Sequence, residues 1–213
     1  MPLLFHEILH PPGEWGLWKI EEPEDWLRDQ LRPHPHEERQ LTAIRGEERR
    51  REFLAARLLL HRMSGRKERG RLLKDTDGKP HLENSLFFVS ISHTVGYSAA
   101  LAHPRPCGID VQRIVERITH LAGKFVAPAE RRQLVPDYAL LQLHLIWAAK
   151  EAMYKAYGRR QLDFRKHLQV EFGGFHPGQS EGTGRLRTPS TVMSFHLNWK
   201  VYPEFVLVAA VAR

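Results

Sequence analysis

The chain has 213 residues, of which 42% are hydrophobic and 27% charged, and its formal net charge is +7. This composition predicts a soluble globular protein with one large domain or two of about 100 residues each. The single cysteine, Cys107, excludes an intramolecular disulfide and favours a cytoplasmic protein. No apolar run approaches the roughly 20 residues that span a bilayer, and residues 1–15 lack the features of a signal peptide. We therefore expect no membrane partner.

The positive charge indicates a polyanionic partner, which could be nucleic acid, a phosphorylated small molecule or an acidic protein. A basic nucleic-acid-binding module is one alternative, and it would bind DNA or RNA with a steep dependence on salt. The sequence lacks zinc-knuckle spacing, and its aromatic residues do not alternate with basic ones in an RNA-binding pattern. We therefore expect no nucleic-acid partner.

The N-terminal half is predicted to combine one long helix with several strands. Leu54, Leu58 and His61 share one side of the helix. After residue 20 comes a segment rich in Glu, Pro and His that runs to about residue 40. The expected elements are a strand at 17–20, a helix at 47–63, a solvated charged turn at 66–71, a turn at 75–80, a strand at 86–92, a turn at 93–96 and a strand at 97–102.

The C-terminal half repeats this combination. His103-Pro-Arg-Pro106 is a break that predicts a boundary between domains 1–105 and 106–213. The expected elements are a strand at 107–111, helices at 118–125 and 128–134, a long helix at 138–157 capped by Gly158, and strands at 168–172, 192–199 and 205–211, with a loop at 173–190. The predicted fold class is therefore α/β (α+β), with a small sheet and a long helix in each half.

The first chemical motif is Gly108-Ile109-Asp110-Val111-Gln112. Strand side chains alternate, so Ile109 and Val111 can enter the core while Asp110 and Gln112 face a pocket. Two oxygen ligands two residues apart suit a hard cation such as Mg²⁺. The alternative is an Asp that caps a turn at the strand end.

The second motif places Lys150, Glu151 and Lys155 on the long helix. Glu151 and Lys155 are four residues apart and could form an ordinary surface ion pair. The helix is otherwise apolar, which predicts that it lies largely buried. Charged groups on such a helix need partners, and a metal ion together with a phosphate would supply them.

Two further groups of residues could bind phosphate. Ser92 and His93 lie at a strand end, where a hydroxyl, an imidazole and backbone N–H groups can hold an anion, although a plain hairpin is the alternative. Arg49 and Arg57 are eight residues apart on the first long helix, close enough in angle to reach one ligand. A solvated helix face is the alternative for these arginines.

The order and spacing of these motifs resemble the 4'-phosphopantetheinyl transferase superfamily. The resemblance covers residues 49–157 and rests on Ser92-His93, on Gly108-Ile-Asp110 and on Trp147-x-x-Lys-Glu-Ala-x-x-Lys155. The chain length is similar to that of the monomeric type that activates peptide and polyketide synthetases. The resemblance implies two similar α/β halves with coenzyme A in the cleft between them.

The resemblance also implies an activity, that of a holo-[acyl-carrier-protein] synthase. Such an enzyme transfers the 4'-phosphopantetheine group of coenzyme A to a serine of an acyl or peptidyl carrier protein and releases 3',5'-ADP. Asp110 and Glu151 would bind Mg²⁺, and Glu151 is also a candidate base for the serine. Lys155 would neutralise the pyrophosphate of coenzyme A.

The other implied roles concern binding. Ser92 and His93 resemble contacts to the nucleotide end of coenzyme A, including its 3'-phosphate. Arg49, Arg57 and Lys79 match basic positions that bind the same phosphates, and Lys150 is expected to join them. Phe125 and Glu130 match a segment that lies close to the carrier protein.

Gln112 departs from the family, in which the third metal ligand is usually Glu. An amide oxygen adds no charge, so we expect weaker metal binding. An inactive relative that only binds coenzyme A remains an alternative on this ground.

Overall fold

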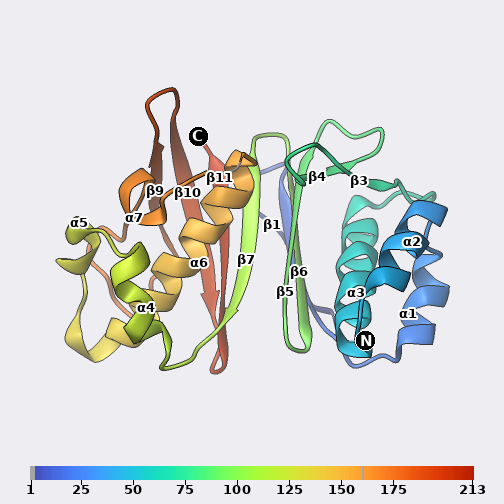
Figure 1. Ribbon diagram of the computed structural model, residues 1–213, viewed down its shortest axis with the longest axis horizontal. Coiled ribbons are helices and arrows are strands. Elements are labelled where there is room, and N and C mark those ends of the chain that lie inside the picture. Colours follow the sequence, from blue (N-terminus) through green and yellow to red (C-terminus); the bar gives the residue numbers. More distant parts are fainter. Residues whose placement is uncertain (1–2, 160) are drawn as a thin grey trace. The chain divides into compact units, whose positions relative to one another are not determined.

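The computed structural model describes residues 3–159 and 161–213 (Figure 1). The chain divides into two compact units: unit 1 ends at Pro104, and unit 2 runs from Arg105 to Arg213. This boundary lies one residue before the one we expected. Each unit contains an antiparallel sheet with a long helix against it, so the predicted mixed fold class is confirmed.

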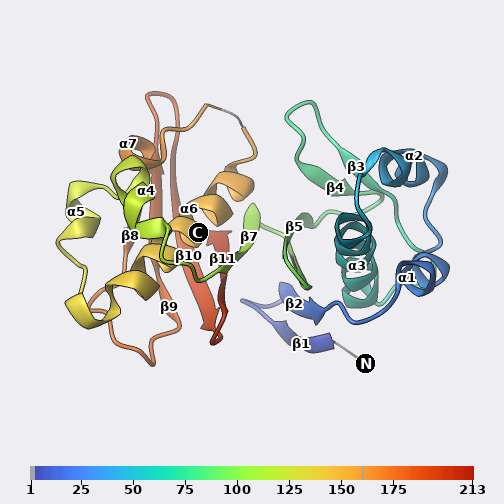
Figure 2. The same cartoon turned by 60° about the horizontal axis from the view of Figure 1, so that its bottom comes forward.

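Unit 1 is built on a six-stranded sheet in the order β1-β2-β6-β5-β4-β3. The strands are β1 Leu3–Ile8, β2 Glu14–Lys19, β3 Leu72–Lys74, β4 Pro80–Leu82, β5 Phe88–Thr94 and β6 Tyr97–His103. The helices are α1 Glu24–Leu31, α2 Pro35–Ala43 and α3 Glu47–Ser64. All three helices lie on one side of the sheet (Figure 2). Leu54, Leu58 and Met63 of α3 pack with Trp18 and Val89 of the sheet in one buried cluster.

Helices α1 and α2 occupy the Glu/Pro/His-rich segment, to which we had assigned neither a helix nor a strand. Pro35 stands at the start of α2, where its missing N–H costs nothing. Glu37 accepts a hydrogen bond from the backbone N–H of His34 at 3.0 Å, which satisfies a donor at the helix end. The signals for α2 were therefore local, and apolar periodicity did not reveal them.

The turn expected at 93–96 is shorter in the structure, because β5 continues to Thr94. His93 therefore lies within a strand, paired with Ser98 of β6. Gly96, with a φ of 78°, supplies the left-handed backbone that the tight connection to β6 requires.

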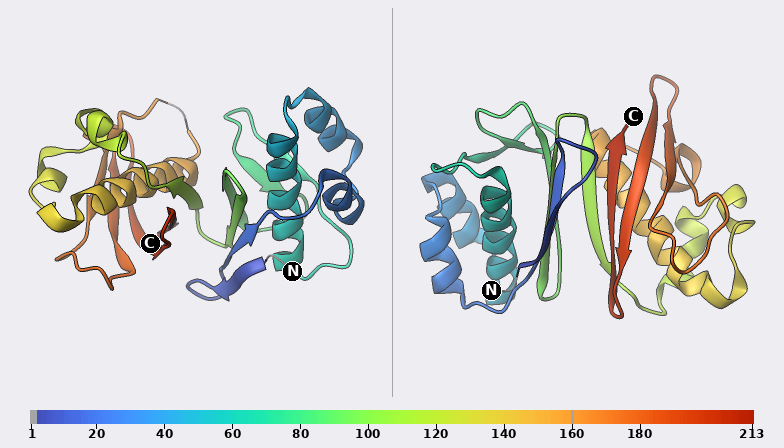
Figure 3. Two further views of the ribbon diagram at one scale, coloured as in Figure 1. Left: turned by 90° about the horizontal axis from the view of Figure 1, so that it is seen from below. Right: turned by 180° about the vertical axis from the view of Figure 1, so that it is seen from behind.

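Unit 2 is built on a five-stranded sheet in the order β7-β11-β10-β9-β8. The strands are β7 Cys107–Arg113, β8 Leu168–Glu171, β9 Glu181–Arg187, β10 Val192–Val201 and β11 Phe205–Ala212. The helices are α4 Ile118–Phe125, α5 Pro128–Arg131, the 3₁₀ turn Pro136–Tyr138, α6 Ala139–Tyr157 and α7 Phe164–His167. Seen from behind, the strands of this unit lie in front of its helices (Figure 3). Gly158 ends α6 in the left-handed conformation, as predicted.

Strand β9 contradicts the loop that we expected at 173–190. It pairs with both β10 and β8 although Leu186 is its only large apolar residue. A Cβ at Gly184 would lie 2.4 Å from the sulfur of Met153, and one at Gly182 would lie 3.1 Å from Trp199. The glycines make room for these large side chains, so the strand carries the composition of a loop.

His144 of α6 links this helix to the segment after β7. It is fully buried, and the backbone N–H of Val115 donates to its Nε2 at 2.9 Å. Burial lowers the pKa of His144, which favours the neutral ring in the folded protein.

The stability of the protein should therefore depend on pH. A base with a lowered pKa in the folded state stabilises the fold at neutral pH, and this contribution is lost as the pH falls below the ordinary histidine value of about 6.5. We expect the free energy of unfolding to fall between about pH 7 and pH 5, and less steeply in His144→Gln, which keeps an acceptor for Val115. Urea unfolding across this range tests the prediction, and an unchanged slope in the variant would contradict it.

Helices in the described part of the chain are all too short or too polar to cross a bilayer.

Candidate active site

Strand β7 approaches α6 unusually closely, and Gly108 permits it. A Cβ at this position would lie 1.9 Å from the backbone oxygen of Ala152 and 2.7 Å from the backbone nitrogen of Ala156. No side chain fits at such distances. The close approach brings the next residue on the same face of the strand, Asp110, beside the last turns of the helix.

Asp110 and Lys155 meet at this contact. The side chain of Asp110 is nearly buried, and Lys155 Nζ donates to its Oδ1 at 2.8 Å and to the backbone oxygen of Ile109 at 2.9 Å. These residues are 45 positions apart in the chain. The fold therefore joins the Asp of the first motif to the second lysine of the helical motif.

The face of β7 that carries Asp110 is the one that packs on α6. Gly108 and Asp110 pair with Ala210 and Val208 of β11, both of which belong to the helix-covered core. Ile109 and Val111 are buried, as we expected for the apolar pair of this strand. Gly108 lets the helix cover the opposite, polar side of the strand, so Asp110 lies against α6.

Glu151 lies one helical turn before Lys155, in the same charged group. Burial raises the pKa of Glu151, the negative charge of Asp110 raises it further, and Lys155 opposes both effects. The two negative charges repel each other in a partly desolvated position. A bound cation would offset this repulsion.

The donor set suits Mg²⁺, because this ion takes one or two carboxylates and completes its shell with water or phosphate oxygens. Among the described residues, no group of three or more Asp, Glu, His and Cys could hold a metal. The assignment of Asp110 and Glu151 as Mg²⁺ ligands, with Gln112 as a further oxygen donor, stays a prediction. Gln112 is half-buried, and its Nε2 donates to the backbone oxygen of Arg113 at 3.3 Å.

Lys150 does not belong to this charged group. It is fully buried, and its Nζ donates to the backbone oxygen of Phe125 at 2.7 Å, to Glu130 Oε2 at 2.7 Å and to the backbone oxygen of Phe164 at 2.9 Å. These three bonds use all three N–H groups of an ammonium. The expectation that Lys150 binds a phosphate of coenzyme A was therefore wrong.

Glu130 is the partner that the sequence reading did not pair with Lys150. It is fully buried and also accepts from the backbone N–H groups of Ala127 and Val170 at 2.7 Å and 2.8 Å. Burial lowers the pKa of Lys150 and raises that of Glu130, while each charge opposes the shift of the other. Glu130 and Phe125, which is 1% exposed, lie inside unit 2, and the expectation that their segment lies close to the carrier protein stays a prediction.

Removing Lys150 should damage the fold. Lys150→Met leaves the carboxylate of Glu130 buried without its counter-charge, and we expect a loss of about 3–5 kcal/mol in the free energy of unfolding. The double variant with Glu130→Gln should recover part of that loss. Urea unfolding of the two variants measures the difference in their free energies of unfolding. If the Lys150→Met protein is as stable as the original, the buried pair of Lys150 and Glu130 does not stabilise the fold.

In unit 1, Arg49 and His93 lie together. Arg49 Nη1 is 3.0 Å from Glu52 Oε2 and 3.1 Å from His93 Nδ1, and His93 Nδ1 is 3.0 Å from the same oxygen of Glu52. The side chains of Arg49 and His93 are 63% and 40% exposed, whereas that of Glu52 is 2% exposed. The structure thus gathers two of the expected phosphate contacts over one buried carboxylate.

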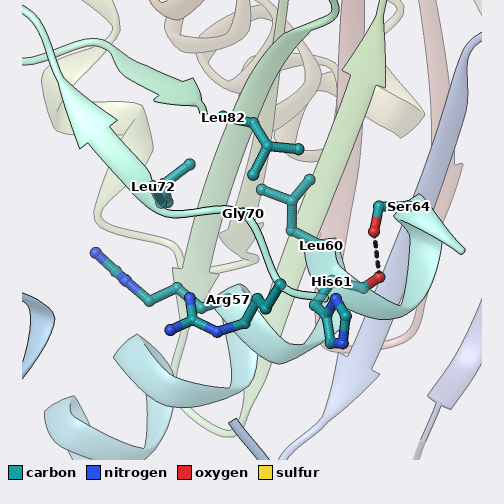
Figure 4. A pocket seen from close by; sticks show the side chains of 8 residues that line it. Arg57, Leu60, His61, Ser64, Gly70, Leu72 and Leu82 are labelled. Atoms are coloured by element: carbon teal, nitrogen blue, oxygen red, sulfur yellow. Dashed lines mark hydrogen bonds between the residues drawn. The ribbon is translucent and has the colours of Figure 1, made fainter. Parts of the chain in front are cut away.

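Arg57 is not part of that group. Its side chain is only 4% exposed, and it lines a small pocket with Leu60, His61 and Leu72 (Figure 4). It donates to Phe53 O at 3.1 Å and to Gln40 Oε1 at 3.3 Å, and its Nε lies 3.5 Å from Glu37 Oε1. Burial lowers the pKa of Arg57 to about 10, and Glu37 opposes the shift.

Glu37 explains why Arg57 is buried. This fully buried carboxylate also binds Arg69, whose Nη2 lies 2.5 Å from Glu37 Oε2. The expectation that Arg57 binds a phosphate was therefore wrong, and so was the expectation that the segment 66–71 is simply solvated. Both errors come from Glu37, whose helix α2 we had not predicted.

Ser92 and Lys79 are the remaining residues that we expected to contact coenzyme A. Ser92 is buried in β5, next to His93. Lys79 precedes β4, and its Nζ lies 5.3 Å from the ring centroid of Phe88. Their roles toward coenzyme A stay predictions. Glu52 is the site residue that sequence reasoning missed, although its position three residues after Arg49 was a local signal for an ion pair.

Family models match two stretches of the chain, one in each unit. Residues 37–103 match the 4'-phosphopantetheinyl transferase N-terminal domain, and residues 106–203 match the 4'-phosphopantetheinyl transferase superfamily. No curated protein matches the chain. The second stretch contains Asp110, Glu151 and Lys155, the group whose geometry is described above. The chain belongs to the 4'-phosphopantetheinyl transferase superfamily.

Proposed function

We propose that this chain transfers the 4'-phosphopantetheine group of coenzyme A to a serine of an acyl or peptidyl carrier protein and releases 3',5'-ADP. It acts as a holo-[acyl-carrier-protein] synthase and as a cytoplasmic monomer, of the type that serves peptide and polyketide synthetases. The observation that carries the proposal is the pair of carboxylates Asp110 and Glu151 held beside Lys155.

The reaction forms a bond between the serine oxygen and the β-phosphorus and breaks the bond from that phosphorus to the bridging oxygen of the pyrophosphate. Glu151 accepts the proton of the serine hydroxyl, directly or through water. Its raised pKa suits a base, since a carboxylate that is less stable when ionised takes a proton more readily. The ammonium of Lys155 offsets the charge that develops on the phosphates.

A bound Mg²⁺, held by Asp110 and Glu151 with Gln112 as a further donor, would supply charge neutralisation at the pyrophosphate. Asp110 also fixes Lys155 through the hydrogen bond between their side chains. Replacing Asp110 would therefore disturb both the metal and the lysine.

The cations of unit 1 bind the nucleotide end of coenzyme A. Arg49 and His93 present a guanidinium and an imidazole at the surface of the unit. The guanidinium can bind a phosphate through charged donors, and the imidazole can do so when it is protonated. Ser92 and Lys79 join them in the proposal. The net charge of +7 favours encounter with an acidic carrier protein.

The proposal is tested by following 3',5'-ADP. With an apo carrier protein, coenzyme A and Mg²⁺, the protein should release one 3',5'-ADP for each serine modified, and EDTA should stop the release. A folded sample that binds coenzyme A but releases no 3',5'-ADP with several carrier proteins would point to a binding protein. Binding to DNA or RNA in place of coenzyme A would reject the assignment altogether.

Gln112 offers a test of the metal. Glu at this position adds a negative charge two residues from Asp110, and carboxylates bind Mg²⁺ more strongly than amides. We expect Gln112→Glu to lower the Mg²⁺ concentration needed for half-maximal transfer, measured by titrating Mg²⁺ at saturating coenzyme A. If the requirement is unchanged, Gln112 has no part in metal binding.

A further inference from the structure

Glu52 is a buried charged group that the reaction itself does not use. It stands on α3, its side chain is 2% exposed, and its Oε2 lies 3.0 Å from both Arg49 Nη1 and His93 Nδ1. Its backbone oxygen accepts a hydrogen bond from Ser98 Oγ at 3.1 Å, which ties this turn of the helix to β6. The residue is therefore held through both its backbone and its side chain.

We propose that Glu52 is a positioning residue that aims Arg49 and His93 at the 3'-phosphate of coenzyme A and so makes the protein select coenzyme A over 3'-dephospho-coenzyme A. The inference rests on the proposed function, because it needs coenzyme A as the ligand. Glu52 thereby determines which of these two closely related nucleotides the protein binds more tightly.

The hydrogen bonds of Glu52 set the orientation of both side chains. When a protonated His93 donates its Nδ1–H to the carboxylate, its second donor, Nε2–H, lies on the other side of the ring, away from Glu52. Arg49 would otherwise be a long exposed side chain with many rotamers, and one of its nitrogens is fixed by the same carboxylate oxygen.

The negative charge of Glu52 does not repel the phosphate strongly, because Arg49 and His93 cover it. The carboxylate is nearly buried, while Arg49 and His93 are 63% and 40% exposed. An approaching anion therefore meets the guanidinium and the imidazole first. Because charge-assisted hydrogen bonds are about twice as strong as neutral ones, the carboxylate orients these groups better than a neutral acceptor would.

The test compares two ligands in three proteins. Dissociation constants for coenzyme A and 3'-dephospho-coenzyme A are measured by titration calorimetry with the original chain, Glu52→Gln and Glu52→Leu. Gln keeps a neutral acceptor and Leu keeps none, so the preference for coenzyme A should fall in the order Glu, Gln, Leu. We expect a loss of roughly tenfold or more in Glu52→Leu, as for removal of charged hydrogen bonds, with little change for 3'-dephospho-coenzyme A.

The matched control is Glu24→Gln. Glu24 accepts from Arg50 Nε at 2.8 Å, so this variant weakens an ion pair to the arginine next to Arg49 and leaves the group around Glu52 intact. Its preference for coenzyme A should equal that of the original chain. If Glu52→Leu fails to fold, the comparison is made with Glu52→Gln, which is nearly isosteric.

The outcomes are distinct. A preference that falls in the Glu52 variants alone supports the inference. A parallel loss of affinity for both ligands would mean that Glu52 only stabilises the fold, and an unchanged preference would mean that it has no role; either result overturns the inference. If the original chain binds coenzyme A but shows no preference, the inference fails while the proposed function stands. If it does not bind coenzyme A at all, both fail.

Discussion

Replacing Glu151 by Gln is expected to lower the rate of phosphopantetheine transfer by roughly 10²–10⁴-fold, the usual effect of removing a general base. The same change should raise the melting temperature of the metal-free protein. The pKa of Glu151 is raised in the fold, so its contribution to stability is present at acid pH and is lost as the pH rises through the folded-state pKa. At neutral pH, the neutral Gln therefore removes an unfavourable buried charge. Transfer rates and thermal melting of the purified variant measure both effects.

Two further variants are compared with Glu151→Gln. Asp110→Asn should lose activity in the same way, since it removes a carboxylate of the pair and a partner of Lys155. Glu171→Gln, an exposed residue of β8, is the control and should leave both rate and melting temperature unchanged. A Glu151→Gln variant that keeps a rate within about threefold of the original would lose less than the removal of a general base costs. Such a result would contradict the assignment of Glu151 as the base.

Gly108→Ala is expected to destabilise unit 2 by about 3 kcal/mol or more, because its methyl group would overlap the backbone of α6. The nearest atom, the oxygen of Ala152, would lie at 1.9 Å, and it cannot move away as a flexible side chain could. Any protein that folds should also transfer poorly, since the strand must retreat from α6 and carry Asp110 with it. Urea unfolding followed by circular dichroism gives the free energy.

Gly123→Ala is the matched control. Gly123 lies in α4, and no atom from another part of the fold lies within 4 Å of the position that a Cβ would take there. Because Ala favours the helix over Gly, this variant should be more stable by about 0.5–1 kcal/mol. If Gly108→Ala and Gly123→Ala were equally stable, the close approach of β7 and α6 would not be a constraint on the sequence.

The parts of the fold that could be predicted are those with strong periodic signals. The helix expected at 47–63 is α3, Glu47–Ser64, and the one expected at 138–157 is α6, Ala139–Tyr157. Both are long, largely apolar on the buried side and followed by a glycine in the left-handed conformation. The length, the apolar periodicity and the terminal glycine of these two segments all indicate a helix. Their structure could therefore be predicted without knowing what packs against them.

Elements that depend on neighbours could not be predicted in this way. Strand β1 was missed, and β9 carries glycines because Met153 and Trp199 fill the space beside it. A glycine that makes room for a distant side chain looks, in the sequence, like a glycine in a loop. Only the packed structure separates the two cases.

The same limit applies to the charged residues. Asp110 and Lys155 came from the motif, and the structure joins them by a hydrogen bond. Lys150 and Arg57 carried the same positive charge in the sequence, but buried carboxylates from earlier in the chain hold them inside their units. The partners Glu130 and Glu37 lie on short helices, α5 and α2, so their meeting with these cations depends on tertiary contacts.

The intact mass of an apo carrier protein, after incubation with this protein, coenzyme A and Mg²⁺, shows directly whether phosphopantetheine is transferred. We expect the carrier to gain one phosphopantetheine group on its serine, and to gain none with EDTA or with the Asp110→Asn variant. A carrier protein that keeps its apo mass, in several cases and with a folded sample that binds coenzyme A, would contradict the proposed function.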